Sequence, residues 1–487
     1  MGEKILIHAA YPLSRKHLLV TVARARQLQD NGDDVVMTYC AAKGGVCTVN
    51  HTGNPALCNI CQATLRGTAK SAGIKTIPLS DEAASSLASS QQPTNSERRR
   101  LVEGVYSDLI SRFRLLKSDL NRNPLLRAIK SRYYQTALRR MRAFLGLIES
   151  QQPDRVEVFN GRLACGKFPL LAAKRHDLPI TTLEIGAGGI PIVFDGHTAH
   201  DRHAIQQRML SCEADMEQAE EYFSRRRSPK FSRFTKQQQG GFTPPDMSAF
   251  DRKFTFFLSS QDEFESLGPD WRSSFDDYAA VVEAACRRFP NDFFVVRFHP
   301  NQGKIRSDIL TPFAPLEALP NAQIYEPDSG VNSYELIEWS DVVITFGSTV
   351  TLEACWAGRP TIMLGPSFFD QLGIALSPAT MQQFLELLAG EVPVSDRTNA
   401  ARAAAFWLAD NDPLPNLQGS GNRMTPIGFR RSHRGLARMS RLFEKFASLL
   451  IKPLARMTAK RQTPLATDES PVEKRAQQQR AQQQRAA

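Results

Sequence analysis

The segment that most constrains the fold is residues 341–365, DVVITFGSTVTLEACWAGRPTIMLG, which has the pattern of one complete β-α-β unit. Residues 341–346 form a short apolar run rich in β-branched side chains, typical of a parallel strand covered on both faces. Gly347 permits a sharp turn, and Gly358 and Pro360 end the helix that follows it. The pattern therefore predicts an α/β protein with buried parallel strands.

The start of this predicted helix carries side chains suited to a ligand. Ser348 and Thr349 follow Gly347 at the point where free backbone N–H groups and the helix dipole favour an anion. Glu353 lies one turn further along the same face, where its carboxylate could accept hydrogen bonds from sugar hydroxyls. The segment thus offers a phosphate site beside a hydroxyl-binding site. The alternative is an ordinary β-α-β unit whose helix is capped by Ser348.

Polar residues also follow three other predicted strands, at 254–258, 293–298 and 361–364. In chain order these strand ends carry Ser259 and Ser260, His299 and Pro300, and Ser367. Ligands of open α/β sheets bind beyond the carboxyl ends of the strands. We therefore expect these side chains to gather on one rim, although a histidine in this position is often a simple cap.

Residues 254–375 resemble the C-terminal half of a GT-B glycosyltransferase, and more narrowly the bacterial capsule polysaccharide biosynthesis proteins. The matching stretches are Ser259–Phe264, Arg297–Asn301, Ser333–Ile337, Phe346–Thr349, Glu353–Ala354, Gly358–Pro360 and Leu364–Pro366. That family is similar to the inverting sialyl- and Kdo-type transferases, which carry a His-Pro pair and a Ser-Ser/Thr pair around the donor's nucleotide phosphate. The resemblance implies that His299, Ser348 and Thr349 hold a nucleotide-sugar donor.

The N-terminal half has the pattern of a second domain of the same kind. Predicted strands at Lys4–His8 and at 34–39 flank a helical stretch, which is the opening of a doubly wound sheet. A later strand ends in Asn160 and Arg162, and the next ends in Glu184, stretches that also resemble the capsule family. We therefore expect two Rossmann-like doubly wound domains facing a cleft (GT-B-like), with helical extensions. Glu184 is the candidate base, and Asn160 and Arg162 are candidates for binding the acceptor substrate, unless Arg162 simply pairs with Glu184.

Composition shifts suggest the domain limits. We expect an N-terminal acceptor domain at 1–241 with a helical insertion at 95–150, and a nucleotide-sugar domain at 242–410. A basic amphipathic segment follows at 411–462, and a Gln- and Arg-rich tail at 463–487 is predicted to be disordered.

Four cysteines in the N-terminal half, Cys40, Cys47, Cys58 and Cys61, lie within twenty-two residues, and the last two form a C-x-x-C pair. Thiols this close in sequence are typical of a structural zinc site, in which His51 could replace one ligand. The alternative is a group of buried cysteines in a loop region, and the redox interpretation of the C-x-x-C pair is weaker.

The net charge of +11 is concentrated in two segments. Residues 97–150 carry thirteen Lys or Arg against five acids, and residues 420–461 carry eleven against one. Such localised charge favours an anionic partner, for which we consider a membrane surface, while the helices could equally pack on the protein. Nucleic acid is not expected, because aromatic residues are not interleaved with the basic ones. The apolar runs are too short for a membrane span or a signal peptide, so we expect a cytoplasmic protein, peripheral to the membrane at most.

These features predict an inverting glycosyltransferase that needs no metal, since no Asp-x-Asp pair follows the strand ends. The expected partners are a nucleotide sugar, with a CMP-linked sugar favoured by the resemblance, and a glycan or lipid-linked acceptor. No cofactor is expected apart from the structural zinc considered above. A sugar-nucleotide epimerase of the same fold, a non-catalytic assembly protein and a nucleic-acid-binding protein remain as alternatives.

Overall fold

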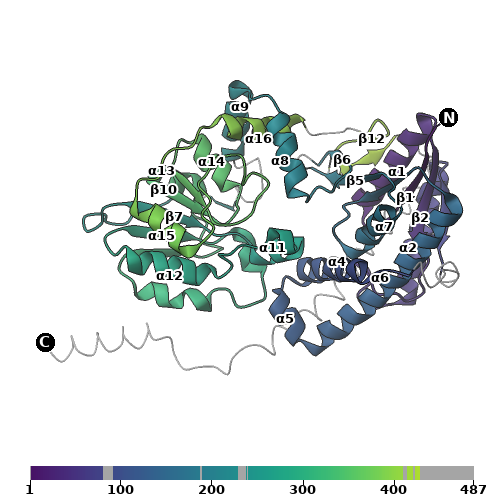
Figure 1. The fold of residues 1–487 in the computed structure, drawn as a ribbon, viewed down its shortest axis with the longest axis horizontal. Helices are drawn as coiled ribbons and strands as arrows, with labels where there is room; N and C mark the ends of the chain where they lie inside the picture. Colours follow the sequence, from purple (N-terminus) through teal and green to yellow (C-terminus); the bar gives the residue numbers. More distant parts are fainter. Residues whose placement is uncertain are drawn as a thin grey trace. The chain divides into compact units, whose positions relative to one another are not determined.

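Two large β-sheets, of six and five strands, organise the described part of this computed structural model (Figure 1). The structure describes residues 2–80, 92–186, 189–228, 237–238, 240–409, 414–420 and 423–427. All of these residues belong to one compact unit. Most of the predicted basic segment at 411–462, and all of the predicted tail at 463–487, lie outside the described residues.

The first sheet has the strand order β3-β2-β1-β4-β5-β6. Its strands are β1 (Lys4–His8), β2 (Asp34–Cys40), β3 (Lys75–Leu79), β4 (Arg155–Phe159), β5 (Ile180–Ile185) and β6 (Pro191–Asp195). All neighbours are parallel except β6, which runs antiparallel to β5. Ile5 and Ile7 of β1 pack with α1 (Arg15–Asp30) and α2 (Pro55–Ser71). On the other face, His8 contacts Phe144 of α6 (Pro124–Gln151) and Phe168 of α7 (Ala164–Arg175). The alternation of β1 thus buries both faces of the sheet.

The second sheet has the order β11-β10-β7-β8-β9 and is parallel throughout. Its strands are β7 (Lys253–Phe257), β8 (Phe293–Arg297), β9 (Ala322–Tyr325), β10 (Val342–Thr345) and β11 (Thr361–Met363). One face packs on α12 (Tyr278–Arg288) and α15 (Met381–Ala389), and the other packs on α13 (Ser333–Trp339) and α14 (Val350–Trp356).

The two sheets share one winding pattern. Taken in chain order, the first five strands of each sheet lie in the order 3-2-1-4-5, so the connections reverse direction between the first and fourth strands. This reversal creates a topological switch point, at β1 and β4 in one sheet and at β7 and β10 in the other. The predicted α/β fold with two doubly wound sheets is confirmed. Sequence analysis did not predict β3, β6 or β9.

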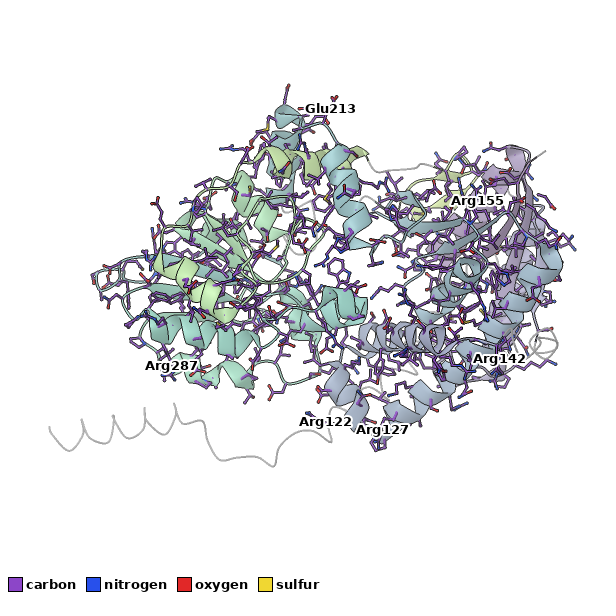
Figure 2. All side chains as sticks on the ribbon, in the orientation of Figure 1. Arg122, Arg127, Arg142, Arg155, Glu213 and Arg287 are labelled. Carbon is purple, nitrogen blue, oxygen red and sulfur yellow. The ribbon has the colours of Figure 1, made fainter. Side chains whose placement is uncertain are left out.

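The helical insertion consists of α4 (Asn95–Phe113), α5 (Lys117–Arg122) and α6 (Pro124–Gln151). α5 and α6 are separated at Asn123, whose side chain accepts hydrogen bonds from the backbone N–H groups of Leu125 and Leu126 at the start of α6. A second break follows α4, where Arg114 adopts a left-handed backbone conformation (φ 54°). Arg122 and Arg127 lie on the outer side of the insertion (Figure 2). Much of the basic charge of the insertion is therefore on a solvated surface.

Packing crosses the boundary that was predicted at residue 241. Helices α8 (Arg202–Ser211) and α9 (Met216–Arg227) precede the second sheet in sequence, but they pack with α14 and α16 (Thr398–Ala409). Conversely, the hairpin of β12 (Leu417–Gln418) and β13 (Thr425–Pro426) packs against α1 of the first sheet. Sequence order alone therefore does not separate the elements that pack on the first sheet from those that pack on the helices of the second.

Candidate functional site

A cavity of about 290 Å³ lies at the carboxyl ends of β7, β8 and β10. We call it the switch-point cavity, because β7 and β10 are the strands at which the winding reverses. Its lining includes five residues that were predicted from the sequence to bind the donor, namely His299, Pro300, Ser348, Thr349 and Glu353. Arg226, Gln238, Arg297, Ser333 and Tyr334 add polar groups.

Gly347 shapes the turn that brings Ser348 and Thr349 to this cavity. Its backbone φ of +80° is one that residues with a side chain rarely adopt. A Cβ atom added at this position would also clash with the carbonyl oxygen of Pro366. The hydroxyl of Ser348 accepts a hydrogen bond from the backbone N–H of Val350 at 3.3 Å. Ser348 therefore binds a backbone N–H at the start of the short helix α14 and lines the cavity at the same time.

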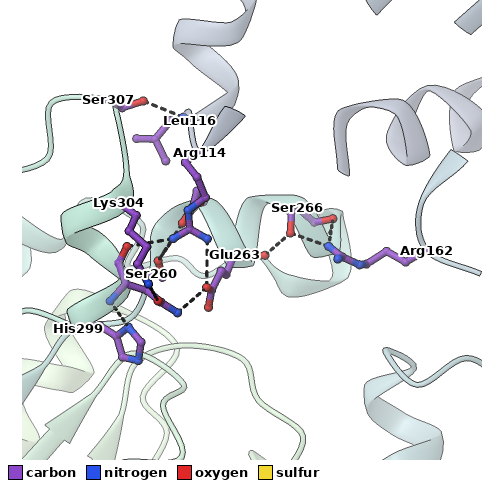
Figure 3. Close-up of polar contacts among 11 residues, drawn as sticks. Arg114, Leu116, Arg162, Ser260, Glu263, Ser266, His299, Lys304 and Ser307 are labelled. Carbon is purple, nitrogen blue, oxygen red and sulfur yellow. Dashed lines mark hydrogen bonds and ion pairs between the residues drawn. The ribbon is translucent and has the colours of Figure 1, made fainter. Parts of the chain in front are cut away.

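His299 is held by its own local turn. The His299 ring makes a hydrogen bond that Figure 3 shows, in which Nδ1 accepts the backbone N–H of Asn301 at 3.1 Å. The backbone N–H of His299 donates to Gln302 Oε1 at 2.7 Å. Burial lowers the pKa of His299 to about 4, with Arg297 adding to the shift and Glu263 opposing it. The ring is thus neutral at pH 7, and because Nδ1 accepts, the proton resides on Nε2. His299 is therefore a hydrogen-bond donor through Nε2.

Glu353 is not a free carboxylate. Its Oε1 lies 2.6 Å from Nε of Arg226 and accepts the hydroxyl of Tyr334 at 3.2 Å. Arg226 also donates to Thr349 Oγ1 at 3.3 Å. Burial works against the charge of Arg226, but Glu353 outweighs that effect, so the pKa of Arg226 is raised. Glu353 was predicted to accept hydrogen bonds from sugar hydroxyls. In the structure its carboxylate already pairs with Arg226, which neutralises its charge.

Arg226 was not among the residues predicted for the site. It belongs to the last turn of α9, where three arginines follow one another, and its partner Glu353 lies 127 positions away. A paired arginine of this kind has no local pattern, since its role depends on two helices that meet only in the folded chain.

Ser259 and Ser260 follow β7 but are not among the residues that line the switch-point cavity. The Ser260 hydroxyl donates to Asp262 Oδ1 at 2.8 Å and accepts from Arg114 Nη2 at 3.2 Å (Figure 3). Ser260 thus joins the second sheet to the helical insertion and does not contribute to the lining of this cavity. Ser367 is buried as well, with its hydroxyl 3.4 Å from Met363 Sδ.

Glu184, at the end of β5, is oriented by two hydrogen bonds. Oε2 accepts Nδ2 of Asn160 at 2.6 Å, and Oε1 accepts the backbone N–H of Ile185 at 2.9 Å. Burial raises the pKa of Glu184, although both hydrogen bonds and Arg162 oppose the shift. Arg162 donates to Ser266 of α11 (Gln261–Leu267), with 2.7 Å between Nη1 and Oγ (Figure 3). Asn160 therefore contacts Glu184, whereas Arg162 is bound to α11, and none of the three residues lines the switch-point cavity.

The four predicted zinc ligands, Cys40, Cys47, Cys58 and Cys61, line a second cavity of about 50 Å³, together with Cys165. Among the described residues, no three His, Cys, Asp or Glu side chains are placed to hold a metal ion. The thiols therefore surround a space rather than converge on a point, and the residues present do not fit a zinc ion. A hydrogen bond from Cys47 lowers the pKa of Cys165 to about 6 against the effect of burial.

Most residues that line the switch-point cavity lie in a part of the chain that matches a known protein family. Residues 248–387 match the family model described as "Capsule polysaccharide biosynthesis protein". The chain is therefore similar to that family over these residues. The match includes the capsule-family residues His299, Pro300, Ser348, Thr349 and Glu353, whereas Arg226 and Glu184 lie outside it.

Single relatives cover the chain less completely. Protein FixF of Sinorhizobium fredii is 25% identical over 171 residues, which is 35% of this chain and 37% of FixF. The match thus spans little more than a third of that relative. Among solved structures, the KpsC β-Kdo 2,4-transferase of Thermosulfurimonas dismutans aligns at 16% identity and a TM-score of 0.35, covering 52% of this chain and 79% of that one. A UDP-GlcNAc 2-epimerase from Neisseria meningitidis aligns at 13% and 0.24, covering 84% and 100%.

No helix in the described parts of the chain combines the length and apolarity needed to cross a bilayer. The predicted peripheral attachment concerns the segment at 411–462, most of which lies outside the described residues.

Proposed function

We propose that this protein is a glycosyltransferase, which moves a sugar from a nucleotide-activated donor to a glycan acceptor of a surface polysaccharide. The observation that carries the proposal is the convergence of His299, Ser348 and Thr349 on one cavity at a topological switch point. The same residues lie in the region that is similar to the capsule polysaccharide biosynthesis family. The switch-point cavity is the proposed donor site.

In this proposal the switch-point cavity stabilises the leaving nucleotide phosphate. The Nε2–H of neutral His299 and the hydroxyls of Ser348 and Thr349 donate hydrogen bonds to phosphate oxygens as negative charge develops there. A neutral imidazole keeps this donor at every pH well above 4. Arg226 and Glu353 hold Thr349 in place, and Tyr334 supports Glu353.

Glu184 is the proposed general base. It takes the proton of the attacking hydroxyl while the new bond to the anomeric carbon forms and the bond from that carbon to the phosphate oxygen breaks. Displacement from the opposite face inverts the anomeric centre. A carboxylate whose pKa is raised by burial is better matched to this task at neutral pH than an exposed one. Asn160 orients the carboxylate through its hydrogen bond to Oε2.

The finer points of the proposal follow from the sequence. A CMP-linked sugar is the proposed donor, a growing polysaccharide or lipid-linked glycan is the proposed acceptor, and no catalytic metal takes part. The basic segment at 411–462 is proposed to hold the protein at an anionic membrane surface, where a lipid-linked acceptor would be found.

Thermal unfolding in the presence of CMP, UDP, GDP or ADP tests the proposal. We expect one nucleotide to raise the melting temperature, and His299→Ala and Ser348→Ala to abolish that rise. Ser259→Ala is the matched control, because Ser259 ends a neighbouring strand without lining the cavity. If no nucleotide at millimolar concentration stabilises the wild-type protein, the transferase proposal fails. If a nucleotide sugar is converted without any acceptor present, the chain is an epimerase instead.

A further inference from the structure

Arg297, the last residue of β8, is buried without a counter-charge. The residue is 2% exposed. Nη1 donates to the carbonyl oxygens of Phe298 and Glu326, the latter at 3.2 Å. Nε and Nη2 are also buried, but neither has a hydrogen-bond partner. Within the described chain, no Asp or Glu forms an ion pair with this guanidinium.

Other arginines of the site region have the partner that Arg297 lacks. Arg226 pairs with Glu353, and Arg114 pairs with Asp262. Burial lowers the pKa of Arg297 to about 10, and no acid offsets that effect. Arg297 therefore remains charged at pH 7, although an unpaired charge in a protein interior is strongly unfavourable. An arrangement of this kind is expected where the counter-ion arrives with a ligand.

The position of Arg297 identifies where that ligand lies. Arg297 lines the switch-point cavity beside His299, and its charge contributes to the low pKa of that histidine. Among the lining residues, Arg226 and Glu353 neutralise each other, and His299 is neutral at pH 7. The cavity consequently carries one net positive charge, and Arg297 supplies it.

The two unpartnered nitrogens also define a geometry. Nε and Nη2 carry the parallel N–H bonds of one edge of the guanidinium plane, the edge that binds both oxygens of a carboxylate or phosphate. Lysine lacks this planar pair of donors and acts as a point charge.

We propose that Arg297 is the anion-binding residue of the switch-point cavity and takes a two-oxygen anionic group of the ligand on its Nε–Nη2 edge. This inference rests on the proposed function in that the ligand is the sugar donor. It adds the chemistry of recognition, since the group bound is either the nucleotide phosphate or a carboxylate of the sugar.

Calorimetric titration of the purified full chain with cytidine, CMP, CMP-N-acetylneuraminic acid and inorganic phosphate tests this assignment. The variants are Arg297→Gln, Arg297→Lys and a control, Arg252→Gln, whose arginine is paired with Asp292 on the same domain. We expect wild type to bind CMP more tightly than cytidine, and Arg297→Gln to weaken CMP binding roughly tenfold or more while leaving cytidine unchanged. Arg297→Lys should recover only part of the loss, and Arg252→Gln should bind as wild type does.

The pattern of losses identifies the anionic group. If Arg297→Gln keeps the preference for CMP over cytidine but loses the added affinity of CMP-N-acetylneuraminic acid, the bound group is the sugar carboxylate. If all ligands bind Arg297→Gln as they bind wild type, the inference is wrong while the proposed donor site stands. If wild type binds no nucleotide, the proposed function fails. In that case, binding of inorganic phosphate to wild type but not to Arg297→Gln would still support the anion site. If wild type does not bind phosphate either, the anion site is overturned.

The stability of the ligand-free protein gives a second readout. A structural role predicts that Arg297→Gln unfolds at a lower denaturant concentration than wild type. A ligand-binding role predicts equal or higher stability, because the substitution removes an uncompensated buried charge and retains a polar side chain. A clear destabilisation together with unchanged ligand affinity would overturn the proposal.

Discussion

Asp108 of α4 shows how burial changes the chemistry of a single residue. Its Oδ2 accepts the Tyr133 hydroxyl and the backbone N–H of Ala164, the latter at 3.1 Å. Burial raises the pKa of Asp108 from 3.8 to about 7. Between these two values the folded protein holds a proton that the unfolded chain has released, so stability declines as the pH rises through this window.

Asp108→Asn should remove this decline, because the amide keeps an oxygen that can accept both hydrogen bonds but does not ionise. We expect the free energy of unfolding of the variant to rise relative to that of wild type between pH 4 and pH 7, by up to about 4 kcal/mol. Urea unfolding across this range measures the difference. Asp30→Asn, in an exposed pair with Arg26, is the control. A difference between Asp108→Asn and wild type that does not change with pH would contradict the prediction.

At the scale of elements, the turn between β10 and α14 decides whether the capsule-family residues reach the cavity. Gly347 and Gly373 both have positive φ, +80° and +69°, yet only Gly347 lies against neighbouring backbone. Alanine at either position incurs the cost of a left-handed conformation, about 1 kcal/mol. At position 347 it must also displace the chain at Pro366.

Gly347→Ala should therefore lower the free energy of unfolding by about 1 to 3 kcal/mol more than Gly373→Ala does. The added Cβ of Gly373→Ala has no heavy atom within 4 Å. The same variant should lose nucleotide-dependent stabilisation, because Ser348 and Thr349 move with the turn. Denaturant midpoints with and without nucleotide measure both effects. Equal midpoints for the two variants would show that the contact with Pro366 relaxes without cost.

At the scale of the molecule, the helical insertion is joined to the second sheet through Arg114. Its Nε lies 2.9 Å from Asp262 Oδ2, a side chain with no exposed surface, and its Nη2 also donates to the carbonyl oxygen of Asn301 (Figure 3). Two backbone N–H groups just after Arg114 extend the contact. That of Leu116 donates to the Ser307 hydroxyl, and that of Lys117 donates to the Glu265 carboxylate. The carboxylate of Asp262 thus depends on a residue about 150 positions earlier in the chain.

Arg114→Ala should destabilise the protein by about 3 to 5 kcal/mol, since it leaves Asp262 buried and unpaired. Arg122→Ala is a matched control on the same insertion, where the arginine is 75% exposed and pairs with Asp119 on the surface. Its cost should stay below about 1 kcal/mol. Unfolding in urea at pH 7 compares the two variants, and similar midpoints would mean that Asp262 finds another partner.

Local sequence patterns were enough to predict the α/β class, the two doubly wound sheets, the placement of His299, Ser348 and Thr349 just beyond strand ends, and that of Glu353 on the helix that follows. These features follow from local patterns, because buried apolar runs, Gly and Pro act within a few residues. Strands such as β3 and β9 escaped prediction because they are sheet edges with half-exposed side chains, so they lack a continuous apolar run.

Tertiary structure alone decided which polar groups meet. It paired Arg226 with Glu353 and Ser260 with Arg114, packed α8 and α9 on the helices of the second sheet, and left Arg297 without a counter-charge. It also opened a space between the cysteines that a zinc site would have required to converge. The two pairings depend on contacts between segments more than a hundred residues apart, and the other outcomes depend on burial in the folded chain. Neither has a local signature in the sequence.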